Sequence, residues 1–190
     1  MSSWPSWRPP TPTQPPEPVR VSGKGKVVTE QLTPPSGVNR ITFTHAGRRN
    51  FIVHGYWADG KEDFFVNAIG AYQGQRLLVG DTPLYLEVDA DGAWTVEIEP
   101  IAHTGTTAQA IEGTGDTVSD IFDPAGARPV PYHLTHTGKR NFIVHLYCAG
   151  GDDSVANEIG AVEGDVVVRF DTGPCVWEVQ ADGAWTIAPK

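Results

Sequence analysis

The chain is poor in the residues on which membrane-spanning and nucleic-acid-binding proteins depend. Its 190 residues include one Met and two Cys, and there is no run of about 20 apolar residues, so no membrane insertion is expected. Lys and Arg number 14 against 23 Asp and Glu, a formal charge of −9. Residues 21–100 carry seven bases and ten acids (−3), and residues 109–190 carry five and twelve (−7). Without a basic patch, nucleic acid and anionic membrane surfaces are not expected partners, because both bind clustered Lys and Arg.

The N-terminal segment also lacks the charged and apolar regions of a signal peptide. A cytoplasmic location and release by lysis, as for virion proteins, both stay open. Residues 1–19 form a proline-rich arm, with seven prolines in the first 18 positions. Such a segment cannot bury enough apolar area to offset its ordering entropy, so we expect it to be extended or disordered on its own. Its exceptions, Trp4 and Trp7, are candidate anchors for a groove on a partner protein.

Stretches with helical periodicity are scarce, whereas glycine (21) and proline (16) are abundant, as is typical of a turn-rich all-β chain. The chain is also duplicated. Residues 44–54 match residues 135–145 at an offset of 91, and residues 87–95 match residues 178–186. The sequence therefore predicts two tandem antiparallel β-sandwich domains of jelly-roll type, at residues 20–100 and 109–190, joined by a linker at 101–108 behind the arm.

The turn chemistry of each copy predicts hairpins. Asp91-Gly92 and Asp182-Gly183 are the pair favoured where both central residues of a two-residue hairpin have positive φ. Gly47 lies between two strand-like segments and predicts a second hairpin. In that hairpin, His45 stands opposite Asn50.

The shared motifs are Gly-x-Gly, His-x-Gly-x-Arg-Asn-Phe-Ile-Val, Asn-x-Ile-Gly-Ala-x-x-Gly and Glu-Val-x-Ala-Asp-Gly-Ala-Trp-Thr. Together they resemble a repeat found in poorly characterised bacterial proteins, with no assigned activity. The closing strand pattern more distantly resembles bacterial pre-peptidase C-terminal modules, which are jelly-roll-like and non-catalytic. That resemblance implies a fold and transfers no functional residue.

Repeated histidines are the first candidates for chemistry, since His45 and His54 recur as His136 and His145. In the hairpin predicted above, His45 and His54 lie about 13 Å apart along the ladder at about 3.3 Å per residue. Zinc needs ligands at about 2 Å, so no metal is expected between them. The acidic loops at Lys61-Glu62-Asp63 and Asp152-Asp153 could hold a weak surface ion, although no EF-hand ligand set is present.

No nucleophile elbow or other catalytic motif is found, so we expect neither enzymatic activity nor a cofactor. The two cysteines both align with aromatic residues of the first copy, Cys148 with Trp57 and Cys175 with Tyr85. A disulfide could replace an aromatic contact there, and it would favour an oxidising setting. Two independent small apolar side chains are the other reading.

Four aromatic residues cluster around the loops of the first copy only: Trp57, Phe64, Phe65 and Tyr72. Exposed, they could bind glycan. Buried, they would pack against the second copy or another subunit. The missing chemistry, the duplication and the arm favour a structural protein that binds a protein partner or neighbouring subunits, such as a virion decoration protein or surface-layer subunit. A carbohydrate- or ligand-binding module is the alternative, and a virion or extracellular surface is the favoured location.

Overall fold

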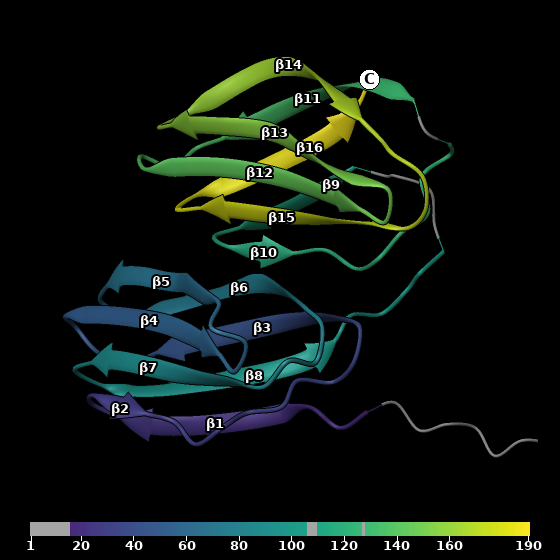
Figure 1. Ribbon diagram of the computed structural model, residues 1–190. Helices are drawn as coiled ribbons and strands as arrows, with labels where there is room; N and C mark the ends of the chain where they lie inside the picture. The colour runs from purple at the N-terminus through teal and green to yellow at the C-terminus, as the bar shows by residue number, and fades with distance from the viewer. Residues whose placement is uncertain (1–15, 106–109, 127) are drawn as a thin grey trace, which may run out of the picture.

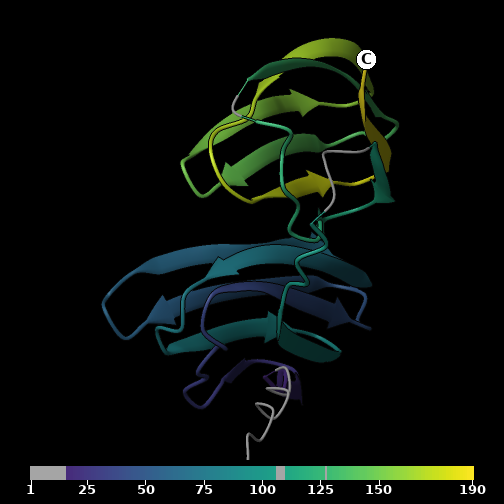
Figure 2. The same ribbon diagram turned by 90° about the vertical axis from the view of Figure 1, so that its right-hand side faces the viewer.

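The computed structural model describes residues 16–105, 110–126 and 128–190, and it is all-β throughout this part. Two β-sandwiches follow each other along the chain and stack in space (Figures 1 and 2), each built from two four-stranded antiparallel sheets. The predicted pair of tandem β-sandwiches is thus confirmed. No segment of the described chain forms a helix with the length and apolar character needed to span a bilayer. Trp4 and Trp7 lie outside the described residues.

Domain 1 contains eight strands, and its two sheets have the orders β1-β8-β3-β6 and β2-β7-β4-β5. This alternation of sheets along the chain is the jelly-roll topology. The strands are β1 (Val19–Lys24), β2 (Val27–Val28), β3 (Val38–His45), β4 (Asn50–Trp57), β5 (Glu62–Ile69), β6 (Tyr72–Val79), β7 (Leu84–Ala90) and β8 (Ala93–Pro100).

Domain 2 repeats the topology, with each strand number raised by eight: β9-β16-β11-β14 and β10-β15-β12-β13. The strands are β9 (Ile111–Thr114), β10 (Thr117–Val118), β11 (Pro129–His136), β12 (Asn141–Cys148), β13 (Gly151–Ile159), β14 (Val162–Arg169), β15 (Cys175–Ala181) and β16 (Ala184–Pro189).

Strict alternation of side chains creates each core. In β3 and β4 every second residue is buried, because successive side chains of a strand point to opposite faces. Full burial of one such aliphatic or Phe side chain stabilises the fold by about 1.5–3 kcal/mol. The completely enclosed side chains of domain 1 include Ile41, Phe43, Phe51, Val53, Leu84, Leu86 and Trp94, and those of domain 2 include Tyr132, Leu134, Phe142, Val144, Leu146 and Trp177.

The predicted hairpins at Asp91-Gly92 and Gly47 are wrong. β7 and β8 belong to different sheets, as do β3 and β4, so both connections arch across the sandwich. Neither Asp91 nor Gly92 has a positive φ. Glycine is needed for a different reason: a Cβ on Gly92 would lie 2.6 Å from the Cα of Gly47. The two arches therefore touch backbone to backbone, and the sequence signal for a tight turn came from close packing.

A second close approach explains the Gly-x-Gly motif at the start of each copy. The indole of Trp94 lies against Gly23, where an added Cβ would be 2.5 Å from a ring carbon, and its Nε1 donates to the carbonyl of Gly25 (3.1 Å). Domain 2 repeats this contact, with Trp185 donating to the carbonyl of Gly115 (3.0 Å). Both tryptophans are therefore core anchors, each with its one polar atom satisfied.

Candidate interaction surfaces

Of the repeated histidines, His45 and its counterpart His136 lie against the arches. His45 is buried, stacks on Phe51 with 4.6 Å between ring centroids, and has Nδ1 2.7 Å from the carbonyl oxygen of Gly70. A carbonyl only accepts, so Nδ1 carries the proton. Nε2 lies 3.3 Å from Asp91, without the alignment of a hydrogen bond. His54 points to the opposite, outer face of β4 beside Phe64.

The predicted partners of these histidines were wrong, because they assumed the hairpin. His45 is aligned across the sheet with Tyr72 and Trp94, not with Asn50. Within the described chain, no group of three or more His, Cys, Asp or Glu is placed to hold a metal ion.

Asp91 holds the arch by accepting the backbone N–H groups of Arg48 and Arg49, both at 3.1 Å. These hydrogen bonds favour the carboxylate and lower the pKa of Asp91. Asp182 in domain 2 has the same arrangement, and the N–H of Arg140, followed by that of Lys139, lowers its pKa. The repeated Asp-Gly pair is therefore a structural brace.

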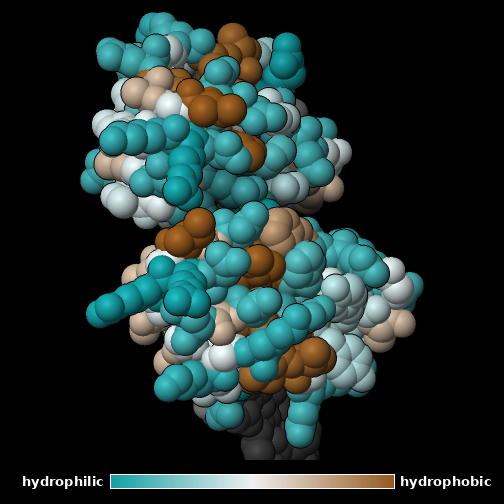
Figure 3. Space-filling view, turned by 90° about the vertical axis from the view of Figure 1, so that its left-hand side faces the viewer, coloured by the Kyte–Doolittle hydropathy of each residue, from teal (hydrophilic) through white to brown (hydrophobic). Residues whose placement is uncertain are grey.

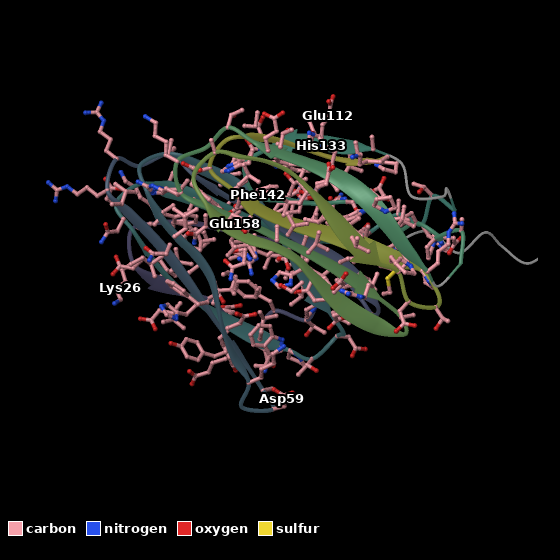
Figure 4. The ribbon with its side chains drawn as sticks, turned by 90° about the horizontal axis from the view of Figure 1, so that it is seen from above. Lys26, Asp59, Glu112, His133, Phe142 and Glu158 are labelled. Atoms are coloured by element: carbon pink, nitrogen blue, oxygen red, sulfur yellow. A yellow bond between two sulfur atoms is a disulfide. The ribbon has the colours of Figure 1, made fainter. Side chains whose placement is uncertain are left out.

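A disulfide joins Cys148 and Cys175, which face each other on β12 and β15 with Cα atoms 4.0 Å apart (Figure 4). The N–H and C=O of Cys175 both bond to Phe122 on the other side. Cys148 and Cys175 are consequently a non-hydrogen-bonded pair, the kind in which Cα atoms approach most closely.

The residue that Cys175 replaces is Leu84, and the predicted match to Tyr85 was wrong by one position. Leu84 faces Trp57 just as Cys175 faces Cys148. The disulfide therefore replaces a Trp–Leu contact of the core rather than a pair of aromatic rings.

The four aromatic residues singled out in the first copy do not form one surface. Trp57 and Phe65 lie in the core, with 5.6 Å between their ring centroids. Tyr72 is partly buried, and its hydroxyl donates to Asp116 of domain 2 at 2.6 Å. Only Phe64 is exposed (45%). The predicted ring cluster is therefore wrong as a ligand face, because three of its members are used for packing.

A different aromatic surface occupies the outer face of the sheet β2-β7-β4-β5. We call it the domain 1 outer face, and its members lie on four neighbouring strands. Phe64 contacts His54 at 4.6 Å between centroids, and Tyr56 stands opposite Tyr85. Of its members, only Phe64 was predicted to belong to a binding surface, although strict alternation along β4 and β7 indicates most of the others. Its members are Val28, His54, Tyr56, Phe64, Tyr85 and Glu87.

This surface combines apolar side chains with one carboxylate. Val28, Phe64 and Tyr85 are 63%, 45% and 40% exposed, and the hydroxyl of Tyr56 donates to Glu87 at 3.4 Å. Exposed aliphatic and aromatic side chains beside a satisfied polar group are typical of a binding surface. The arch end of the molecule differs, since Figure 3 shows only scattered apolar patches among hydrophilic residues there.

The equivalent face of domain 2 is already occupied. There the sheet edge formed by β6 of domain 1 packs against β10 (Figure 1) and reaches Glu178 of β15. The N–H of Gln75 donates to the carbonyl of Asp116 (3.1 Å), and the N–H of Leu77 donates to Glu178 (3.1 Å). Arg76 adds a charged contact from its Nε to the same oxygen of Glu178 (2.7 Å). Domain 2 thus satisfies an edge strand that would otherwise present unpaired N–H groups.

Arg40 and the short strand β10 extend this contact. The guanidinium of Arg40 donates to the carbonyl of Val118 (2.9 Å) and to Asp120 (3.1 Å). In return the N–H of Val118 donates to the side-chain oxygen of Gln75 (3.1 Å). An apolar cluster lies behind these bonds and contains Ile101, Val118 and Val176 with Val38, Leu77, Ile121 and Tyr147 packed around them.

Burial in this interface changes the acidity of its polar groups. Desolvation raises the pKa of Asp116, although Tyr72 and the N–H of Ala181 both donate to it. Burial raises the pKa of Tyr147 to about 12, and the neighbouring Glu178 adds to the shift. The contact between the two domains is therefore a desolvated interface.

The two faces correspond position by position. Because β2, β4 and β7 have the places that β10, β12 and β15 have in domain 2, equivalent residues follow from the strand registers. Domain 1 therefore exposes, on its own outer face, counterparts of the residues by which domain 2 holds β6. The pairs are Val28 with Val118, Tyr56 with Tyr147, Tyr85 with Val176, and Glu87 with Glu178.

No protein-family model matches this chain, and no curated protein sequence matches it either.

Proposed function

We propose that this chain is a non-catalytic structural protein that binds a protein partner through the domain 1 outer face, as a subunit or decoration protein of a larger assembly. One observation carries the proposal. The corresponding face of domain 2 holds a strand edge in this structure, whereas the domain 1 face exposes Val28 and Tyr85 at the places of Val118 and Val176.

The chemistry of the surface supports a protein partner. Buried aromatic and aliphatic side chains at the centre of a patch, with polar groups that stay hydrogen-bonded, provide most of the binding energy in protein interfaces. Tyr85 and Val28 supply the apolar part, and Glu87 supplies an acceptor for a strand N–H.

Two further features favour an assembly outside the reducing cytosol. The Cys148–Cys175 disulfide is typical of an oxidising setting such as a virion or cell surface. Jelly rolls occur in capsid proteins as well as lectins, so the topology is compatible with this role without specifying it. In this proposal the arm, with Trp4 and Trp7, is the tether to the assembly.

A glycan ligand remains the second candidate, and one observation favours it. Phe64, His54, Tyr56 and Tyr85 place their rings on one flat sheet face, as sugar stacking requires. Of the four residues first considered for such a site, only Phe64 belongs to it.

Site-specific photo-cross-linking tests the proposal. One variant of the chain carries a photoreactive amino acid in place of Tyr85 and is cross-linked among its natural partners. A second variant carries the same amino acid in place of Val79, which is 69% exposed on the other sheet. We expect a discrete protein adduct from position 85 alone, and we expect Glu87→Lys to abolish it. Equal labelling at both positions, or none at position 85, contradicts a protein-binding face. Glycan-array binding that disappears in Phe64→Ala would instead support the glycan candidate.

A further inference from the structure

We propose that the partner of the domain 1 outer face is a second copy of this chain, which docks the free edge of its β14 there. This inference rests on the proposed function. The contact between molecules would repeat the contact between domains within one molecule. Because donor edge and acceptor face differ, the association is head-to-tail and leaves one of each free at the ends of a growing chain.

The donor edge is β14, which has in domain 2 the place that β6 has in domain 1. Val167 stands at the position of Leu77, since it pairs with Pro131 where Leu77 pairs with Arg40. The carbonyl of Pro131 accepts from the N–H of Lys190 on the β16 side. Val167 and Pro131 therefore form a non-hydrogen-bonded pair, so the N–H and C=O of Val167 point away from the sheet.

This edge is apolar at its centre and exposed. Val167 is 54% exposed, and no strand in the described part of the chain pairs with the outer side of β14. Unpaired edge strands tend to add another strand or surface, and in this protein β6 does so. Val167 is thus equivalent to Leu77, with the same outward N–H.

The acceptor face offers Val167 what domain 2 offers Leu77. Glu87, at the place of Glu178, would accept the N–H of Val167. Val28 and Tyr85, at the places of Val118 and Val176, would cover its side chain. Val28 and Tyr85 are 63% and 40% exposed, as expected of a surface that a neighbour covers.

A compensating pair of charge changes links the two surfaces. Within the molecule, the backbone N–H of Gln75 on the donor edge donates to the backbone carbonyl of Asp116 on the acceptor, which brings these two positions together. In the contact between molecules, Asp165 stands at the place of Gln75 and Lys26 at the place of Asp116, so opposite charges would come together. Within one molecule Asp165 pairs with Lys190, and Lys26 lies 3.4 Å from Glu87. Lys26 projects outward at the margin of the molecule in Figure 4, and its side chain is 63% exposed. Opposite charges at equivalent positions favour this register of docking over others.

The contact between molecules lacks two arginines of the internal one. Val166 stands where Arg76 does, and Pro131 stands where Arg40 does. Neither the Arg76–Glu178 bond nor the Arg40 bonds to β10 can form, so we expect reversible, concentration-dependent association. The tandem duplication keeps one copy of the strong contact inside the chain.

Sedimentation velocity of the full chain over a wide concentration range is the first test. We expect the mean mass to rise with concentration, and Val167→Asp to abolish the rise because it buries a charge against Val28. Ile159→Asp is the matched control, since Ile159 is also exposed (79%) but lies on β13 away from the edge. A chain that stays monomeric, or equal behaviour of both variants, overturns the inference.

A charge reversal tests the register. Lys26→Glu should weaken association about tenfold or more, because like charges then meet across the contact. Asp165→Lys added to Lys26→Glu should restore it. Failure of the double variant to recover, with both variants folded by circular dichroism, removes the proposed alignment. If the wild type is monomeric while position 85 cross-links to a different protein, the proposed function survives and only the second copy as partner is rejected.

Discussion

The two domains share a fold and its internal braces, and they differ where they meet their surroundings. Each has a Trp anchored on a Gly-x-Gly segment, a His stacked on a Phe, and an Asp that holds the β3–β4 or β11–β12 arch. One has a Trp–Leu contact where the other has a disulfide. The shared residues therefore define the jelly roll, and the divergent ones are where different roles are to be sought.

The divergence is directional. Domain 1 has Arg76 on its donor edge, Arg40 on the neighbouring β3 and an exposed acceptor face, whereas domain 2 has a covered acceptor face and carries Val166 and Pro131 at these two positions. A duplication that keeps one strong internal contact fixes the order of the domains. It also leaves the domain 1 outer face and the β14 edge of domain 2 available for contacts with other molecules.

Removing the shared tryptophan is the strongest test of equivalence between the domains. Trp94→Ala and Trp185→Ala should each cost about 3–5 kcal/mol, because both delete a nearly fully buried ring and leave a cavity. Urea unfolding measures the loss, and amide hydrogen exchange assigns it to one domain. Val79→Ala, at an exposed site, is the control. A cost below about 1 kcal/mol for either Trp variant would show that its ring does not anchor the core.

Reduction of the disulfide should destabilise domain 2 and leave domain 1 unchanged. Cys148 and Cys175 are 27 residues apart, and a chain-entropy model gives about 3–4 kcal/mol for closing such a loop. We expect reductant, or the Cys148→Ala/Cys175→Ala variant, to destabilise domain 2 by this amount. Exchange of amides in β12 and β15 should accelerate, whereas β4 and β7 should be unaffected. Equal acceleration in both domains would mean that the disulfide stabilises the pair and not domain 2 alone.

Replacing Arg76 by valine, the residue that domain 2 has at the equivalent position 166, tests the interface between the domains. Arg76→Val leaves Glu178 buried without its countercharge, which should cost about 2–3 kcal/mol of coupling between the domains. Calorimetry should then resolve two transitions that lie further apart than in the wild type. Val79→Ala, at an exposed site on the same strand as Arg76, is the control and should change stability by less than about 0.5 kcal/mol. If both variants behave alike, the Arg76–Glu178 contact does not hold the domains together.

Local patterns were sufficient for much of the fold, but not for sheet assignment. Alternation and duplication predicted strands and two sandwiches. Asp91-Gly92 was interpreted as a hairpin because a close backbone approach to Gly47 selects the same residues as a tight turn. Only the pairing of β7 with β4, and of β8 with β3, shows that the chain arches between sheets.

The candidate site was harder to predict, because its surfaces depend on small shifts of register. A β-bulge between Val53 and His54 changes the phase of β5, so that Phe64 faces solvent while both Phe65 and Val66 are buried. The match of Cys175 to Tyr85 was an error of one position that the sequence itself corrects, because the offset of 91 that joins Glu87 to Glu178 gives Leu84. The occupied face of domain 2 depends on contacts between domains, and no local pattern encodes them.

The smallest expected effect is on the pH dependence of the free energy of unfolding. One carboxylate in each domain, Asp91 or Asp182, contributes to it in one direction, and Asp116 in the interface contributes in the other. The pKa of Asp91 is lowered by the N–H groups of Arg48 and Arg49, and that of Asp182 is lowered similarly. A lowered pKa in the folded state means that the unfolded chain binds the proton more tightly. The stability that each carboxylate contributes is therefore present above the unfolded value of about 3.9 and is lost as the pH falls through the folded value.

The contribution of Asp116 to stability changes with pH in the opposite direction. Desolvation raises its pKa, so its protonation favours the folded, docked state, and this contribution is lost as the pH rises through the raised value. Urea unfolding from neutral to acid pH measures both effects. Asp91→Asn and Asp182→Asn should each remove a similar part of the acid destabilisation, whereas Asp116→Asn should make the acid loss steeper. Unequal slopes for Asp91→Asn and Asp182→Asn would show that the two arches, despite matching geometry, are not energetically equivalent.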